Sequence, residues 1–171
     1  MSRRSSRTAL ATALALALLG APAAGSSPAR QATVGRIVDG DTLVLAGGVR
    51  VRLLQIDAPE AGDECYATAS AWELARLASP GARVGLEADP ELDRVDRYGR
   101  LLRYVHAGGR NVNVELVRRG AATPWFYRGE RGRYAARLLE AVAAARRERR
   151  GLWGACRVRW SPDGPVETAR R

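Results

Sequence analysis

The sequence predicts an α+β domain, in which five short strands close into a small β-barrel and three helices pack around it. Two observations carry this prediction. The first is a series of valine- and leucine-rich runs separated by tight turns that contain glycine. The second is a change to helical spacing of the apolar residues in three other segments. At 171 residues, the chain has a length that favours one domain.

The first 24 residues are predicted to be a secretory signal peptide. Three arginines precede an apolar run from Ala9 to Leu19, and small residues follow from Ala21 to Gly25. A basic head, a short apolar middle and an A-x-A end are typical of such signals, and the run is too short to span a bilayer comfortably. Residues 25–32 are predicted to be a polar leader. We therefore expect a secreted or periplasmic protein that has no membrane span once the signal is removed.

Residues 33–156 are predicted to form the folded domain. Its strands are expected at residues 34–38, 42–45, 49–56, 82–88 and 100–105. Asp39-Gly40-Asp41 and Gly47-Gly48 supply the first two turns, because Asp-Gly and Gly-Gly between β-rich runs favour hairpins. The first three strands should therefore form an antiparallel meander.

The helices are expected at residues 64–79, 112–119 and 130–149. In the first, alanines and Leu74 recur at helical spacing, and Ser79-Pro80-Gly81 ends the pattern. Five strands with this placement of helices suit a barrel of the OB type. Such barrels bind oligonucleotides on one face, although a fold alone does not establish function. Residues 157–171 are predicted to be a flexible C-terminal tail.

The formal net charge is +10, and +7 remains when the three signal arginines are removed. Every basic residue is arginine. A basic surface favours an anionic partner, and phosphates are the commonest one. Binding to a membrane surface and a merely solvated surface are the alternatives.

The chain has two cysteines, Cys65 and Cys156. In an exported protein, paired cysteines usually form a disulfide. This one would close a loop of about 90 residues, worth about 4–5 kcal/mol in the chain-entropy model. Two separate thiols are the alternative. A zinc site is disfavoured because the only histidine is His106.

Five charged residues lie where predicted strands end or turn, and they suit phosphodiester hydrolysis. They are Asp41, Arg52, Asp57, Glu60 and Arg100. Carboxylates hold hard metal ions, and a guanidinium presents a planar fork of donors to phosphate oxygens. Pro59 fixes the backbone between two of the carboxylates.

The motifs around these residues resemble those of the staphylococcal nuclease family, secreted calcium-dependent nucleases on an OB barrel. The resemblance extends from Thr33 to about Trp153. Five motifs occur in order: Val38-Asp39-Gly40-Asp41-Thr42, Arg52 to Glu60, Asp96-Arg97-Tyr98-Gly99-Arg100, Asn113 to Gly120, and Gly151-Leu152-Trp153.

The resemblance implies a Ca²⁺ ion held by Asp41, Asp57 and the backbone carbonyl of Ala58. It casts Glu60 as the general base, or as the group that positions the attacking water. Arg52 and Arg100 correspond to the family's two catalytic arginines.

The resemblance also implies aromatic contacts to the substrate. Tyr98 corresponds to a phosphate contact. In the stretch Trp125-Phe126-Tyr127, a gapless alignment gives the substrate-binding role to Phe126, and a shift of one residue gives it to Trp125 and Tyr127. Packing between the barrel and the last helix is the alternative for this stretch.

The function that the resemblance implies is a secreted, calcium-dependent endonuclease that acts on DNA and RNA with little sequence specificity and leaves 3′-phosphate ends. We expect a monomer. The main alternative is a non-catalytic nucleic-acid-binding OB module of the same family. An envelope-interaction protein that uses the arginine-rich segment 141–150 is a further alternative, but cations near the C-terminus of a helix also suit its dipole.

Overall fold

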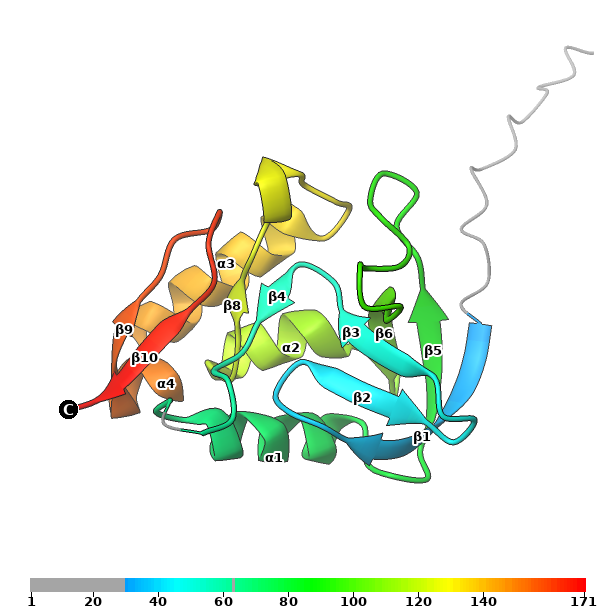
Figure 1. Ribbon diagram of the computed structural model, residues 1–171. Coiled ribbons are helices and arrows are strands. Elements are labelled where there is room, and N and C mark those ends of the chain that lie inside the picture. Colours follow the sequence, from blue (N-terminus) through cyan, green and yellow to red (C-terminus); the bar gives the residue numbers. More distant parts are fainter. Residues whose placement is uncertain (1–29, 63) are drawn as a thin grey trace, which may run out of the picture.

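The valine- and leucine-rich runs form the strands of a closed barrel, coloured blue to green in Figure 1. The structure is a computed structural model that describes residues 30–62 and 64–171. The predicted signal peptide lies outside the described residues, as do residues 25–29 of the predicted leader.

Five strands make the barrel, and they are β1 (Arg30–Ile37), β2 (Thr42–Leu45), β3 (Arg50–Leu53), β5 (Arg83–Glu87) and β6 (Leu101–Ala107). Their order is β3-β2-β1-β5-β6, and a parallel pairing of β3 with β6 closes the sheet on itself. With three main helices around it, this is the predicted α+β fold with a five-stranded OB-type barrel.

Strand β1 belongs to both halves of the barrel. Its first four residues pair with β5, and the rest pair with β2 after an irregularity between Val34 and Arg36. Gly35 lies at this irregularity, where an added Cβ would approach the carbonyl oxygen of Leu45 to 3.0 Å. The bend lets one strand turn a barrel corner. It also means that the barrel begins at Arg30, so the last residues of the predicted leader are part of β1.

The strand predicted at 49–56 is interrupted. A turn at Leu54 and Gln55 separates β3 from the short strand β4 (Ile56–Asp57). Gln55 adopts φ of 58°, a left-handed conformation that is uncommon for residues other than glycine. Strand β4 leaves the barrel and pairs with β8 (Thr123–Pro124) instead.

The three predicted helices are present. They are α1 (Ala67–Leu77), α2 (Val112–Arg119) and α3 (Ala135–Arg147). Helix α2 follows the short strand β7 (Arg110–Asn111) and has the predicted bounds, because Asn111 caps its start and Gly120, with φ of 69°, ends it. Helix α3 starts later than predicted, at Ala135, and a 3₁₀ turn at Tyr127–Gly129 lies just before the predicted start. No helix of the described residues is long and apolar enough to cross a membrane.

The hydrophobic core joins the barrel interior to the helices. Leu53 from β3, Leu74 from α1, Leu116 from α2 and Leu138 from α3 are all fully buried in it. Helices α2 and α3 pack against each other, and Figure 1 shows them beside the barrel, behind the β4–β8 pair. This core fixes the strand ends from which the candidate site is built.

The C-terminal segment differs from the predicted flexible tail. After the short helix α4 (Leu152–Ala155), the strands β9 (Cys156–Arg159) and β10 (Glu167–Arg170) form an antiparallel hairpin, orange to red in Figure 1. The predicted disulfide between Cys65 and Cys156 is present, with a Cα–Cα distance of 6.0 Å. It ties the start of the hairpin to the segment before α1.

Candidate active site

The turn between β1 and β2 presents Asp41. Asp39 Oδ1 accepts a hydrogen bond of 3.0 Å from the Asp41 amide, which closes the turn. Gly40 has no room for a side chain, because an added Cβ would collide with the side chains of Ser70 and Ala58. This close packing holds the Asp41 carboxylate against the segment that follows β4.

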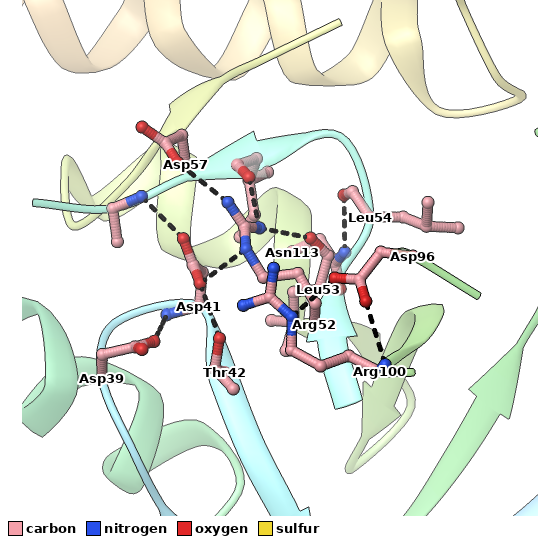
Figure 2. Close-up of polar contacts among 12 residues, drawn as sticks. Asp39, Asp41, Thr42, Arg52, Leu53, Leu54, Asp57, Asp96, Arg100 and Asn113 are labelled. Carbon is pink, nitrogen blue, oxygen red and sulfur yellow. Dashed lines mark hydrogen bonds and ion pairs between the residues drawn. The ribbon is translucent and has the colours of Figure 1, made fainter. Parts of the chain in front are cut away.

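Arg52 bridges the two aspartates, as Figure 2 shows. Its Nε lies 2.9 Å from Asp41 Oδ1, and its Nη2 lies 2.8 Å from Asp57 Oδ1. Nη1 donates to the carbonyl oxygens of Leu53 at 2.8 Å and Ile56 at 2.6 Å. The guanidinium is buried, and it fixes both carboxylates relative to the turn between β3 and β4.

The donor count of Arg52 limits what it can bind in addition. A guanidinium has five N–H donors, and the contacts to Asp41, Asp57 and the two carbonyls use four of them. One Nη2 hydrogen therefore remains for a phosphate oxygen. Arg52 can make a single directed contact to a substrate while it organises the carboxylates.

Backbone amides hold the other oxygens of the two aspartates. Asp41 Oδ2 accepts from the amide of Ala58 at 2.9 Å, and Asp57 Oδ2 accepts from the amide of Val166 at 2.9 Å. Val166 belongs to the C-terminal segment that was predicted to be a loose tail. Each carboxylate is therefore oriented from two sides.

The site carries an excess of negative charge. Asp39, Asp41, Asp57 and Glu60 act on one another around the single guanidinium of Arg52. Burial raises the pKa of Asp41 to about 7, against the opposing effect of Arg52. Burial also raises the pKa of Asp57, again opposed by Arg52 and by the Val166 amide. A further cation would compensate this charge.

Glu60 lies at the edge of the carboxylate cluster and is exposed to solvent. Its backbone amide donates to the carboxylate of Glu64 at 2.7 Å. Partial burial of its side chain raises its pKa, and the charges of Asp39 and Asp57 raise it further. An accessible carboxylate with a raised pKa is suited to accept a proton from water.

The second arginine, Arg100, is held differently from Arg52. Its Nε lies 2.6 Å from Asp96 Oδ2 (Figure 2), and neither of its Nη groups has a partner among the described residues. Asp96 also accepts from the amides of Tyr98 and Arg100. Burial acts to raise the pKa of Asp96, but these hydrogen bonds outweigh it and lower the pKa. Arg100 therefore offers a free planar fork, which suits bidentate phosphate binding.

An open cavity of about 500 Å³ brings the two arginines and the aromatic residues together. Arg52, Tyr98, Arg100, Trp125 and Tyr127 line it. The Arg52 guanidinium lies 5.9 Å from the centre of the Trp125 ring, and that of Arg100 lies 5.3 Å from the centre of the Tyr98 ring. Asp41, Asp57 and Glu60 are not part of the lining, and Arg52 is the lining residue that contacts both aspartates.

The structure distinguishes the two alignments of the aromatic stretch. Phe126 is fully buried in the core, whereas Tyr127 is 55% exposed and Trp125 is partly exposed. Trp125 and Tyr127 both line the cavity. Of the three predicted substrate contacts in this stretch, the geometry leaves Trp125 and Tyr127 available, and Phe126 has a packing role.

Two buried polar residues that the sequence reasoning did not assign hold the site in place. Asn113 donates to the carbonyl of Leu54 at 2.9 Å and accepts from the amide of Val105 at 3.0 Å, so it joins α2 to the β3–β4 turn and to β6. Gln55 donates to the carbonyl of Glu130 at 2.8 Å and accepts from the Tyr104 hydroxyl at 2.9 Å. Both residues lie in motifs of the family resemblance, because Asn113 begins one motif and Gln55 lies within another.

The donor set fits a calcium ion. Among the described residues, no group of three or more histidine, cysteine or acidic side chains is arranged to hold a metal. A site here would instead use two carboxylates, Asp41 and Asp57, with the carbonyl of Ala58. These are hard oxygen ligands, and their small number leaves positions for water and a phosphate oxygen.

Fold and site together define a small OB-barrel protein with a cavity lined by two arginines next to a carboxylate cluster. Comparison with known proteins narrows this class. The model of the family described as staphylococcal nuclease homologue matches residues 50–155. The chain belongs to the staphylococcal nuclease family.

Three relatives show the range of similarity. Micrococcal nuclease of Shigella flexneri is 38% identical over 130 residues, which are 69% of this chain and 70% of that protein. Thermonuclease of Staphylococcus intermedius is 31% identical over 128 residues, 70% of this chain and 74% of that protein. Endonuclease YhcR of Bacillus subtilis (strain 168) is 32% identical over 136 residues, which are 70% of this chain but only 11% of that much longer relative.

Proposed function

We propose that this protein is an exported, calcium-dependent endonuclease that hydrolyses DNA and RNA with little sequence specificity and leaves 3′-phosphate ends. Membership in a nuclease family supports the phosphodiester chemistry. The observation that carries the rest is the position of Arg52, which contacts Asp41 and Asp57 through its guanidinium and is also a lining residue of the cavity. A phosphate bound there would lie beside both the carboxylates and Arg100.

In the proposed reaction, water attacks phosphorus in line with the bond to the 5′ oxygen. Glu60 is accessible and has a raised pKa, so it is suited to accept the water proton or to orient the water. The new P–O bond forms as the P–O5′ bond breaks. The 5′ oxygen takes a proton from solvent, and Glu60 afterwards releases the proton that it accepted to solvent. The 3′ oxygen stays on phosphorus, which gives a 3′-phosphate.

The two arginines have separate tasks in this proposal. The remaining Nη2 hydrogen of Arg52 contacts one phosphoryl oxygen, in a direction set by Asp41 and Asp57. The two free Nη groups of Arg100 donate hydrogen bonds to the phosphoryl oxygens on which negative charge accumulates. Loss of one such contact typically costs about 10²–10³ in rate.

Asp41, Asp57 and the Ala58 carbonyl would hold the calcium ion. When bound, the ion supplies positive charge that polarises the phosphoryl group. The excess of carboxylates over cations at the site supports this assignment.

Trp125 and Tyr127 would contact the bases next to the scissile phosphate. Stacking on an aromatic ring tolerates any base, because every base has a π-face. This accounts for the proposed lack of sequence specificity.

Export is supported by two separate observations. The first 24 residues have the pattern of a signal peptide, and a disulfide joins Cys65 to Cys156. Disulfides persist mainly in oxidising compartments. Fractionation of cells that produce the full chain tests this point, and retention of uncleaved protein in the cytoplasm would contradict it.

An assay on single-stranded DNA tests the nuclease itself. We expect cleavage with calcium, none with an excess of chelator, and full recovery when calcium is restored. Product ends are identified by phosphatase treatment, which should make the 3′ ends extendable by a polymerase. Cleavage that is unaffected by chelator, or products with free 3′ hydroxyls, would contradict the proposal.

A further inference from the structure

A second cavity lies at the far end of β6 from the candidate active site. It has a volume of about 450 Å³ and lies between β7, the first turns of α2 and the start of α3. Three arginines and one buried amide are the main polar groups of its lining, and they are Arg110, Asn111, Arg118 and Arg137. We call this cavity the arginine pocket. Nothing in the proposed reaction uses it.

The positive charge of the arginine pocket is poorly compensated. Arg110 and Arg137 form no ion pair with the carboxylates of residues 30–62 and 64–171, and Arg118 has a loose one, 3.4 Å from Glu115. Glu115 is shared with Arg119 at 3.1 Å. The other nearby carboxylate, Glu87, is already bound by His106 and by Tyr134. Three guanidinium groups therefore surround the cavity against one shared carboxylate.

The Asn111 side chain adds a donor without an acceptor. Its oxygen caps α2 by accepting from the Val114 amide at 3.0 Å. Its Nδ2 is buried and makes no hydrogen bond within the described part of the chain. Burial raises the pKa of the Tyr134 hydroxyl, and the nearby Asn111 amide opposes this shift. The two groups nevertheless do not meet hydrogen-bond geometry.

A buried donor without a partner is unfavourable, so an acceptor is expected at this position. The three arginines of the lining favour an anionic acceptor over a neutral one. Phosphate matches both features, because it has several acceptor oxygens and a charge that arginine binds well.

The separation of the two sites indicates which phosphate would bind. Arg100 precedes β6 and Arg110 follows it, so the length of the strand separates them by about 20 Å. That exceeds one nucleotide but lies within the stretch of single strand, about 4–16 nucleotides, that an OB fold covers. We propose that the arginine pocket binds a backbone phosphate of the nucleic-acid strand several nucleotides away from the scissile bond. The identity of the strand as substrate rests on the proposed nuclease function.

The phosphate chemistry is tested first, with inorganic phosphate and without metal. In ¹H–¹⁵N spectra of the whole protein, the Asn111 side-chain amide signals should shift and saturate as phosphate is added. Arg110→Gln together with Arg137→Gln should abolish the saturable shift. The matched control is Arg36→Gln with Arg83→Gln, which removes the same charge from exposed positions outside both cavities, and its shift should persist.

The strand is tested by the binding of labelled single-stranded DNA in chelator, where no cleavage occurs. For an oligonucleotide of about 16 nucleotides, the Arg110/Arg137 variant should lower the slope of log affinity against log salt by about 0.7, since each phosphate of a single strand that is neutralised contributes about that much. A dinucleotide, which is shorter than the separation of the two sites, should bind both proteins equally.

The variant Asn111→Asp provides an independent test of the arginine pocket. Aspartate keeps the cap oxygen but replaces the donor with a negative charge, so the long oligonucleotide should bind more weakly while helix content is unchanged.

Two results would overturn the proposal. If the Asn111 side-chain signals do not respond to phosphate, the arginine pocket is not a phosphate site. A phosphate response without any effect of the Arg110/Arg137 variant on the long oligonucleotide, relative to the Arg36/Arg83 control, leaves a site for free phosphate only. Because neither measurement needs cleavage, a protein that binds as expected but does not cut would refute the nuclease and keep the pocket.

Discussion

The backbone amide of Val166 donates a 2.9 Å hydrogen bond to Oδ2 of Asp57. The two residues lie 109 positions apart in the chain, so the C-terminal segment takes part in orienting a carboxylate at the centre of the site. Two further contacts hold this segment: the amide of Phe126 donates to the carbonyl of Pro162 at 2.7 Å, and Trp160 donates to that of Pro124 at 2.7 Å.

Replacement of Val166 by proline removes this one donor. We expect Val166→Pro to lower the unfolding free energy by about 1–3 kcal/mol more than Val166→Ala does, because a buried carboxylate oxygen loses its partner. Calorimetry should also show weaker calcium binding for the proline variant than for the alanine variant. Equal stability and equal calcium affinity of the two variants would mean that the amide has no orienting role.

Gly40 is required for packing, and Gly47 gives a matched control. A methyl group at residue 40 would collide with Ser70 and Ala58, whereas one at residue 47 meets nothing within 4 Å. Gly40→Ala should cost about 1–3 kcal/mol of stability, measured by urea unfolding, and should weaken calcium binding by moving Asp41. Gly47→Ala should change neither. Similar behaviour of the two variants would refute the packing argument.

Trp125 and Phe126 are neighbours with different expected roles. Trp125→Ala should weaken the binding of single-stranded DNA by about 1–3 kcal/mol, the usual worth of one stacked base, with a small effect on stability. Phe126→Leu should lower stability and leave affinity almost unchanged, because its ring is in the core. Fluorescence anisotropy measures the affinity, and urea unfolding measures the stability. If Phe126→Leu weakened binding and Trp125→Ala lowered only stability, the gapless alignment with Phe126 as the substrate contact would be favoured instead.

Acid stability should depend on Glu87. Burial acts to raise its pKa, but hydrogen bonds from Tyr134, His106 and Arg133 outweigh it and lower the pKa below the ordinary 4.5. The unfolded chain therefore takes up the proton first as the pH falls. The stabilisation is complete above the ordinary pKa and is lost as the pH falls through the lower folded pKa.

Urea unfolding at a series of pH values checks this prediction. Between roughly pH 5 and 3, the stability of the wild type should fall more steeply than that of Glu87→Gln. Glu140→Gln, which removes one carboxylate from an exposed position on α3, is the control and should follow the wild type. Parallel curves for wild type and Glu87→Gln would contradict the prediction.

Much of the fold could be predicted because it depends on local patterns. Valine and leucine runs, with Asp-Gly and Gly-Gly between them, were enough to predict the barrel strands, and the caps of α2 agreed with its apolar spacing. The break of the third strand could not be predicted, because the left-handed conformation of Gln55 is maintained by its distant partners Tyr104 and Glu130.

The C-terminal hairpin was missed for a related reason. Its strands are short and rich in arginine, so neither has the apolar content of a strand that folds on its own. The disulfide at Cys156 and the buried contacts of Val166 and Thr168 hold it in place. Tertiary contacts determine the secondary structure of such segments, and these contacts cannot be recognised from the local sequence.

The charged residues Asp41, Arg52 and Asp57 were predicted from the motifs that contain them and from the resemblance to the family. Their direct contact and the donor count of Arg52 required the structure. The choice between Phe126 and its neighbours did too, because alternation along a strand tells only that adjacent side chains face opposite sides.

The central claim is that Asp57 holds the calcium ion whereas Glu60 activates or orients the attacking water. The variant Glu60→Gln tests this claim most directly. We predict that this variant binds calcium and a single-stranded oligonucleotide as the wild type does, while its cleavage rate falls by about 10²–10⁴. A variant that cuts at the rate of the wild type would contradict the role of Glu60. If neither protein cuts in the presence of calcium and both bind alike, the chain is a binding module and not a nuclease.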